Sequence, residues 1–274
     1  MRPLPIFFFA CLVLASCSGE APSDADTGIS DKAVTESPAT PLQPSASPSP
    51  AKAEEFAEEE GDGSWTFEYS WPAKASAIAP LAARLLADRK RIYAETRGEW
   101  EAAQKDSPPD CVSCRSRSFG QEWKVVTDTP RFLSLSAERY VYTGGAHGMS
   151  GFDALLWDKR ADRARDTLAL FTSESAFVQA VRTGFCAALD RERAKRRGDF
   201  EMTVPEFNEC IDPLEATIIL GSSNGKAFNR IGFLIPPYAA GPYAEGSYEV
   251  TLPLAKPALA AVKPEYREYF SVMP

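Results

Sequence analysis

Histidine is almost absent from this sequence, since His147 is the only one among 274 residues. A metal site built from several histidines is therefore excluded. A serine or cysteine nucleophile activated by histidine would have to use His147. Apart from one C-x-x-C motif, no other feature of the sequence indicates a cofactor or a metal. A place in a turn is the first interpretation of His147, a contact on a binding surface the second, and catalysis the third.

Long hydrophobic runs are also missing. The apolar stretch at residues 6–14 is well below the roughly 18 residues that cross a bilayer. It follows Arg2 and ends at Leu14-Ala15-Ser16-Cys17. A basic start, a short apolar centre and small residues at the cleavage site are typical of a secretory signal. Residues 1–16 are therefore predicted to be an export signal peptide and not a transmembrane helix.

The motif Leu-Ala-Ser-Cys resembles the bacterial lipobox, in which the cysteine thiol receives a lipid. The resemblance implies that Cys17 is the lipidated first residue of a mature lipoprotein, held at the membrane by lipid alone. Ser18 is not the aspartate that commonly retains such proteins at the inner membrane. We therefore expect a place in the cell envelope, on the periplasmic face of the outer membrane. An ordinary secreted protein is the alternative.

Residues 17–63 contain little that a core could bury. They are rich in proline, serine, alanine and acid, so we expect a disordered tether. The formal net charge of the chain is −8, yet acidic and basic residues are equal in number from Ser64 onward. The excess charge lies in the tether, where it is predicted to be solubilising. No basic excess in the folded part indicates a nucleic-acid partner. The acidic run consists of Glu54, Glu55, Glu58, Glu59, Glu60 and Asp62.

Cysteine is scarce once the export signal is set aside. Of six cysteines, Cys11 would leave with the signal and Cys17 would carry the lipid. Outside the cytoplasm, the remaining four suggest two disulfides, for which three connectivities exist. We favour a bond within a proline-rich loop and one that joins a helix to the loop after it. A redox or zinc role for the C-x-x-C motif is the alternative, but a second ligand pair is missing. The favoured pairs are Cys111–Cys114 and Cys186–Cys210.

The pattern after Ser64 predicts an α+β fold with largely antiparallel sheets and two main helices packed on them. Aromatic residues alternate with polar ones at residues 65–71, which indicates a strand. Helical periodicity is present at residues 77–104, and again from a Thr172 or Ser173 cap to a stop at Gly198. Strands are predicted at residues 122–126, 131–143, 152–158, 216–220, 231–235 and 248–252, and a short helix at 257–262. The predicted domains are residues 64–160 and 161–274, or one continuous core formed by both.

Two loops carry a resemblance to a known family. Residues 142–148 read Tyr-Thr-Gly-Gly-Ala-His-Gly, and residues 233–246 read Phe-Leu-Ile-Pro-Pro-Tyr-Ala-Ala-Gly-Pro-Tyr-Ala-Glu-Gly. With Thr-Leu-Ala-Leu-Phe at residues 167–171, they resemble the extracytoplasmic paired domains of unknown function of RsiV-type anti-sigma factors. Those proteins are lysozyme receptors, and similar domains accompany a catalytic domain in some peptidoglycan deacetylases. The resemblance covers residues 65–262.

The resemblance implies a non-catalytic module that binds a cell-wall component or a lysozyme-like protein. Exposed tyrosines are common contact residues in interfaces, and glycines permit tight turns. The alternatives are an envelope hydrolase that uses His147 with an acid such as Asp153 or Glu245, and a structural lipoprotein of the stress response. The candidate binding residues are Tyr142, Thr143, Gly144, Gly145, His147, Gly148, Tyr238, Tyr243 and Glu245.

Overall fold

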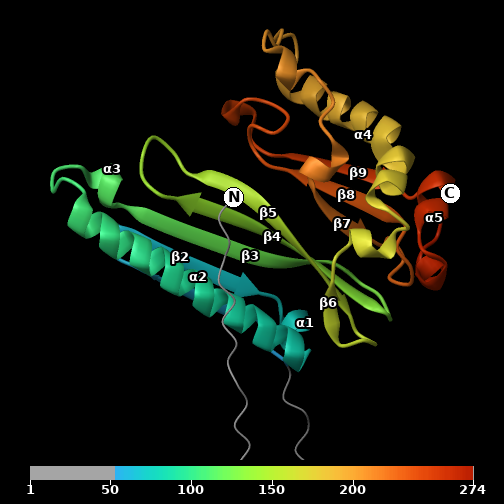
Figure 1. The fold of residues 1–274 in the computed structure, drawn as a ribbon, viewed down its shortest axis with the longest axis horizontal. Helices are drawn as coiled ribbons and strands as arrows, with labels where there is room; N and C mark the ends of the chain where they lie inside the picture. The colour runs from blue at the N-terminus through green and yellow to red at the C-terminus, as the bar shows by residue number, and fades with distance from the viewer. Residues whose placement is uncertain (1–52, 274) are drawn as a thin grey trace, which may run out of the picture. The chain divides into compact units, whose positions relative to one another are not determined.

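The computed structural model describes residues 53–273 (Figure 1). The predicted signal peptide, the predicted lipid site at Cys17 and the tether as far as residue 52 lie outside these residues. The described residues belong to one unit, Pro50–Pro274. Its mixture of a six-stranded sheet, a three-stranded sheet and two main helices confirms the predicted α+β class.

The larger sheet has the strand order β1-β2-β3-β4-β5-β6. All neighbours are antiparallel except β2 and β3, which are parallel. A parallel pair needs a crossover connection, and α2 provides it along the sheet (Figure 1). The strands are β1 (Phe56–Gly61), β2 (Trp65–Trp71), β3 (Arg117–Asp128), β4 (Phe132–Tyr142), β5 (Met149–Asp158) and β6 (Arg163–Arg165), and the helices between them are α1 (Ala73–Ser76), α2 (Ala79–Asp106) and α3 (Val112–Arg115).

The smaller sheet has the order β7-β8-β9 and is antiparallel throughout. The helix α4 lies along it (Figure 1). Ser173 caps α4 by accepting a hydrogen bond from the Ala176 amide, and Gly198 ends it with a φ of 55°. Both boundaries were predicted from the sequence. The elements are α4 (Glu174–Arg197), β7 (Thr217–Gly221), β8 (Arg230–Ile235), β9 (Tyr248–Pro253) and α5 (Lys256–Ala261), with short 3-10 helices at Leu168–Leu170, Pro205–Phe207, Pro213–Glu215, Tyr243–Glu245 and Pro264–Tyr269.

Two hydrophobic clusters form the core, and β4 and β5 contribute to both. Successive side chains of a strand point to opposite faces. Leu133 and Trp157 therefore join the cluster beneath α2, while Phe132 and Leu156 join the cluster of α4 and the smaller sheet. The boundary predicted between residues 160 and 161 stays a prediction.

The end of the expected tether forms strand β1. Phe56 stacks on Trp71 with ring centroids 3.8 Å apart. Glu58 pairs with Arg89 of α2, and Glu60 accepts a hydrogen bond from the Tyr93 hydroxyl at 2.9 Å. The acidic run was interpreted as solubilising because charge alone does not reveal partners on a distant helix. A folded region beginning at Ser64 would lack this edge strand.

Within residues 53–273, none of the helices combines the length and hydrophobicity required to cross a bilayer.

Candidate functional site

The two loops singled out in the sequence meet in the structure. The ring of His147 stacks on the ring of Tyr243, with centroids 3.8 Å apart and planes 20° from parallel. Tyr238 lies beside both rings, and its hydroxyl is 3.4 Å from His147 Nε2. These three side chains are called the aromatic cluster below, and two of them, His147 and Tyr238, are 91 residues apart in the chain.

Gly148 holds the aromatic cluster to the backbone. Its carbonyl oxygen accepts a hydrogen bond from the Tyr243 hydroxyl at 3.0 Å and lies 3.0 Å from His147 Nδ1. Since a carbonyl only accepts, Nδ1 carries the proton in this contact. His147 Nε2 faces the hydroxyl of Tyr238. The histidine ring is thus held in one orientation within the stack.

The other candidates of the first loop shape the turn. Gly144 and Gly145 have φ values of 101° and 94°, which residues with a side chain rarely adopt. A Cβ at Gly144 would lie 3.0 Å from the backbone oxygen of Ser113. The Tyr142 hydroxyl donates to the carbonyl of Gly145 at 2.9 Å. Thr143 is exposed.

Tyr238 occupies a strained position at the surface. Its φ is 71°, although it is not a glycine. A residue with a side chain in this region costs of order 1–3 kcal/mol and persists only where the surroundings fix it. Its side chain is nevertheless 47% exposed. An aromatic side chain held in a strained conformation and presented to solvent is typical of functional sites.

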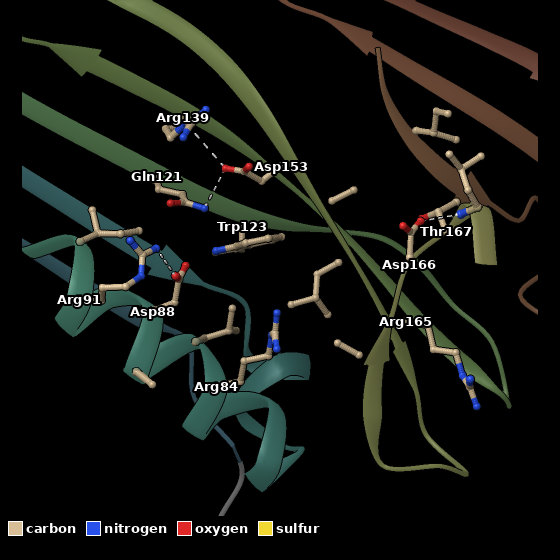
Figure 2. Close-up of a pocket in the computed structure, with 18 of the residues that line it drawn as sticks. Arg84, Asp88, Arg91, Gln121, Trp123, Arg139, Asp153, Arg165, Asp166 and Thr167 are labelled. Carbon is tan, nitrogen blue, oxygen red and sulfur yellow. Dashed lines mark hydrogen bonds and ion pairs between the residues drawn. The ribbon is translucent and has the colours of Figure 1, made fainter. Parts of the chain in front are cut away.

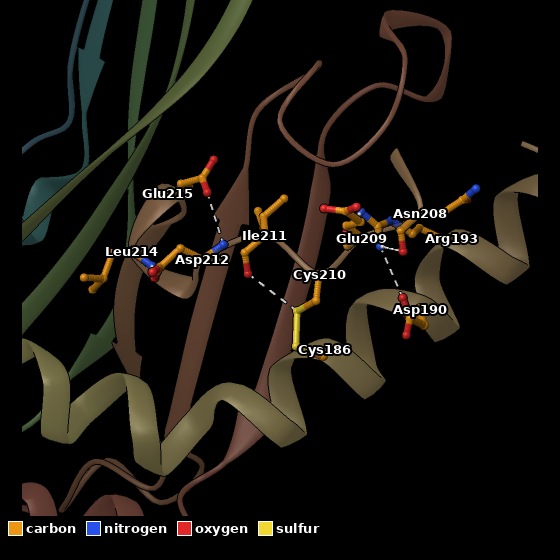
Figure 3. The surroundings of a disulfide bond; sticks show 10 residues. All are labelled: Cys186, Asp190, Arg193, Asn208, Glu209, Cys210, Ile211, Asp212, Leu214 and Glu215. Carbon is orange, nitrogen blue, oxygen red and sulfur yellow. Dashed lines mark hydrogen bonds and ion pairs between the residues drawn. A yellow bond between two sulfur atoms is a disulfide. The ribbon is translucent and has the colours of Figure 1, made fainter. Parts of the chain in front are cut away.

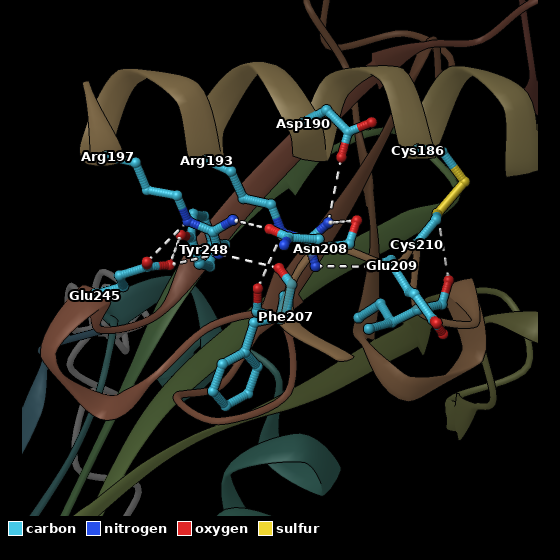
Figure 4. Close-up of polar contacts among 12 residues, drawn as sticks. Cys186, Asp190, Arg193, Arg197, Phe207, Asn208, Glu209, Cys210, Glu245 and Tyr248 are labelled. Atoms are coloured by element: carbon cyan, nitrogen blue, oxygen red, sulfur yellow. Dashed lines mark hydrogen bonds and ion pairs between the residues drawn. A yellow bond between two sulfur atoms is a disulfide. The ribbon is translucent and has the colours of Figure 1, made fainter. Parts of the chain in front are cut away.

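Glu245 does not belong to the aromatic cluster. It forms a two-pronged ion pair with Arg197 of α4, with N–O distances of 2.8 and 3.0 Å, and accepts a hydrogen bond from Tyr248 (Figure 4). Burial raises the pKa of Glu245, but Arg197 and Tyr248 outweigh burial and hold that pKa below its ordinary value. Burial, reinforced by Glu245, raises the pKa of Tyr248 to about 12. Glu245 therefore anchors the second loop instead of offering a free carboxylate.

The basic end of α4 positions both neighbouring loops. Arg193 is 3% exposed. Its guanidinium donates to the carbonyl of Ala240 at 2.9 Å and to that of Glu209 at 2.8 Å. Arg197 adds a bond to the carbonyl of Phe207 at 3.0 Å. Cations at a helix C-terminus are favoured by the helix dipole, and here they also act as loop anchors.

Both favoured disulfide pairings are confirmed. Cys186 of α4 bonds to Cys210, with Cα atoms 5.4 Å apart, and fixes the segment ahead of β7 to the helix (Figure 3). Cys111 bonds to Cys114, with Cα atoms 5.3 Å apart. Within residues 53–273, no group of three or more histidine, cysteine or acidic residues lies where it could hold a metal ion.

A groove of about 1000 Å³ lies between α2, the strands β3 and β5, and the start of β7. Figure 2 shows polar side chains on both sides of the groove: Asp88 and Arg91 come from α2, whereas Asp166 and Thr167 follow β6. Gln121 donates to Asp153 at 3.3 Å, and Arg91 pairs with Asp88 at 2.7 Å. Sequence reasoning missed this groove, because its residues are scattered along regular elements without a motif.

Burial raises the pKa of two groups near α2, one in the groove and one behind it. It raises the pKa of Asp153, an effect that Arg139 opposes and Asp88 reinforces. Burial also raises the pKa of Tyr69 far above its ordinary value. The Tyr69 hydroxyl accepts from the Trp123 indole at 3.1 Å and donates to Asp88 at 3.2 Å. This chain of hydrogen bonds fixes one carboxylate of the groove from behind.

The acids considered for a hydrolase have other partners. Asp153 contacts Gln121 and Arg139, and Glu245 contacts Arg197 and Tyr248. The hydrogen bonds of the His147 ring within residues 53–273 go to Gly148 and Tyr238. The pairing of His147 with either acid, as the hydrolase alternative requires, is thus not formed in this structure.

One serine fits a catalytic spacing that the sequence reasoning overlooked. Residues 221–225 read Gly-Ser-Ser-Asn-Gly, which matches G-x-S-x-G. A nucleophile elbow joins a strand to a helix, whereas this segment leads from β7 toward β8. The Ser223 hydroxyl accepts a hydrogen bond from the Asn229 amide at 2.7 Å. Ser223 therefore stabilises a turn.

Comparison with known proteins places the fold. The model of the family described as Deacetylase PdaC matches residues 58–150. A DUF3298 family protein from Pseudomonas aeruginosa PAO1 is similar in structure, with 19% sequence identity and a TM-score of 0.52 over 80% of this chain and 96% of that one. A DUF3298 family member from Bacteroides fragilis NCTC 9343 has 17% identity and a TM-score of 0.43, over 73% and 90% of the two chains. No curated protein matches the chain significantly.

Proposed function

We propose that this protein is a lipid-anchored lipoprotein of the bacterial envelope that binds a cell-wall component or a wall-active protein of the lysozyme type. The lipid would be carried by Cys17, and residues 18–52 would separate the folded region from the outer membrane. The aromatic cluster would be the contact surface. The fold shared with a DUF3298 family protein and the match of residues 58–150 to a family named for a deacetylase are compatible with work at the cell wall.

The observation that carries this proposal is the meeting of His147, Tyr238 and Tyr243. Aromatic residues contribute much of the energy in protein interfaces because they bury a large area with few rotatable bonds. Here the stacked rings are already ordered, so less conformational entropy is lost when a partner binds. Arg193 and Arg197 hold the loop at residues 233–246 from behind.

The test is binding of the purified full chain to insoluble peptidoglycan and, separately, to hen-type lysozyme. Tyr243→Ala and His147→Ala each remove one side of the stack, and we expect at least about a tenfold loss of affinity, as for central contact residues. Lys90→Gln is the control, because it removes an exposed side chain of α2, outside both loops. Its affinity should equal that of the unaltered chain.

Two results would overturn the proposal. One is that neither peptidoglycan nor lysozyme binds the unaltered chain. The other is that both bind with equal affinity to the unaltered chain and to Tyr243→Ala. Release of products from peptidoglycan that His147→Ala abolishes would instead support the hydrolase alternative.

A further inference from the structure

The groove beside α2 is a candidate for a second binding site, and its chemistry differs from that of the aromatic cluster. We propose that it binds a short peptide with a free carboxylate. Backbone N–H groups of the peptide would donate to Gln121 and Asp153, and its carboxylate would pair with Arg84. This inference goes beyond the proposed function, because the aromatic cluster does not line the groove.

Gln121 supplies an unused hydrogen-bond acceptor. Its side chain is only 4% exposed, and its Nε2 donates to Asp153. This contact fixes the amide orientation, because the carboxylate of Asp153 accepts. Gln121 Oε1 then has no hydrogen-bond partner among residues 53–273. A buried acceptor without a partner is unfavourable, because it has lost its contact with water and gained no hydrogen bond in exchange. A ligand with an N–H donor in the groove would restore that hydrogen bond.

Arg84 supplies an unused positive charge at the same groove. It lies four residues before Asp88 on α2, a spacing that places two side chains on one helix face. Arg91 and Arg139 already face Asp88 and Asp153, at 2.7 and 3.8 Å. Arg84 forms no ion pair with any residue between 53 and 273. A ligand carboxylate would give Arg84 an ion-pair partner, as Asp88 and Asp153 do for Arg91 and Arg139.

The same groups favour a peptide over a neutral glycan. Sugar rings usually pack on an exposed aromatic face, but Trp123 is 6% exposed and its indole nitrogen is bonded to Tyr69. Leu168, Leu214 and Ile218 also line the groove and would contact an aliphatic side chain. The volume of about 1000 Å³ is at the upper end of ordinary ligand sites, which suits several residues of peptide.

The experiment is calorimetric titration of the full chain with the tripeptide Ala-Leu-Ala, with the same tripeptide amidated at its carboxyl end, and with tri-N-acetylglucosamine. We expect the free acid to bind at least about tenfold more tightly than the amide. Gln121→Leu should weaken the free acid by at least about tenfold. Arg84→Gln should remove the difference between acid and amide. Lys90→Gln, which removes an exposed cation of α2 outside the groove, should leave all affinities unchanged.

The outcomes separate this proposal from its rivals. Absence of tripeptide binding, equal binding of acid and amide to the unaltered chain, or tighter binding of the glycan would each overturn it. Arg84 is exposed, so Arg84→Gln remains informative even if Gln121→Leu fails to fold, which thermal unfolding would show. Tyr243→Ala should retain tripeptide binding, so failure of the aromatic cluster would leave this proposal intact.

Discussion

The aromatic cluster and the groove position their side chains at the surface in two different ways. The aromatic cluster sits on loops, and its rings are ordered by stacking and by anchors behind them on α4. The groove is built on a long helix and on paired strands, which fix Asp88 and Gln121 directly. Loops therefore need dedicated anchors, whereas regular elements position side chains through their own backbone hydrogen bonds.

The contrast predicts different sensitivities to change. Damage to an anchor of the aromatic cluster should have a large effect on stability without touching a ligand. Removal of a groove side chain should have little effect on stability and a direct effect on binding.

Arg197→Ala should lower the free energy of unfolding by about 3–5 kcal/mol, because it leaves the largely buried carboxylate of Glu245 without its ion-pair partner. Urea unfolding followed by circular dichroism measures the change. Lys195→Ala, two residues away and exposed, is the matched control and should change stability by less than about 0.5 kcal/mol. A loss below about 1 kcal/mol for Arg197→Ala would mean that α4 does not anchor the loop.

Replacing both Cys186 and Cys210 by alanine should cost about 2–4 kcal/mol, since the disulfide closes a sequence separation of 24 residues. The bond between Cys111 and Cys114 spans only 3 residues, so its removal should cost less. Urea unfolding of the two double variants makes the comparison. An equal or reversed order of the two losses would contradict it.

Tyr243→Ala should lower the free energy of unfolding by about 1 kcal/mol beyond the loss of buried area, through the lost stack on His147. Arg84→Gln, at the groove, should be neutral within about 0.5 kcal/mol. Thermal unfolding of both variants tests this difference. If Arg84→Gln proved the more destabilising variant, the groove rather than the loops would depend on its individual side chains.

Acid should act on the two regions with opposite signs. The folded pKa of Glu245 is lowered, so its stabilising contribution is complete above the unfolded value near 4.5 and is lost as the pH falls through the folded value. The folded pKa of Asp153 is raised, so its ionised form costs stability above that raised value. This cost is relieved as the pH falls through the raised pKa toward 3.8.

Glu245→Gln should therefore destabilise the protein at pH 7, and Asp153→Asn should stabilise it slightly. Both differences should shrink as the pH falls. Urea unfolding at several values between pH 7 and pH 3 measures them. A stabilising effect of Asp153→Asn that grows toward acid would contradict the direction of its shifted pKa.

The sequence predicted most of the fold because the relevant signals are local. Alternating aromatic residues mark β2, and a serine cap and a glycine stop bound α4. Strand β1 was missed, since its pairing depends on Phe56 and Glu58 finding partners far along the chain. The parallel register of β2 and β3 was missed for the same reason.

The candidate site was predicted in part. Glycines and tyrosines stand out in loops, so His147, Tyr238 and Tyr243 could be chosen, although their contact is visible only in three dimensions. Glu245 was chosen with them, but its carboxylate forms an ion pair with Arg197. The groove gave no signal, because an unpartnered acceptor such as Gln121 Oε1 is a property of packing.

The most direct test of the aromatic cluster as a binding surface is hydrogen–deuterium exchange of the full chain with and without peptidoglycan fragments or lysozyme. We expect the bound partner to slow exchange at residues 142–148 and 236–246. Tyr243→Ala should abolish this protection. Protection confined to other parts of the chain, with these two loops unchanged, would contradict the assignment of the aromatic cluster as the binding surface.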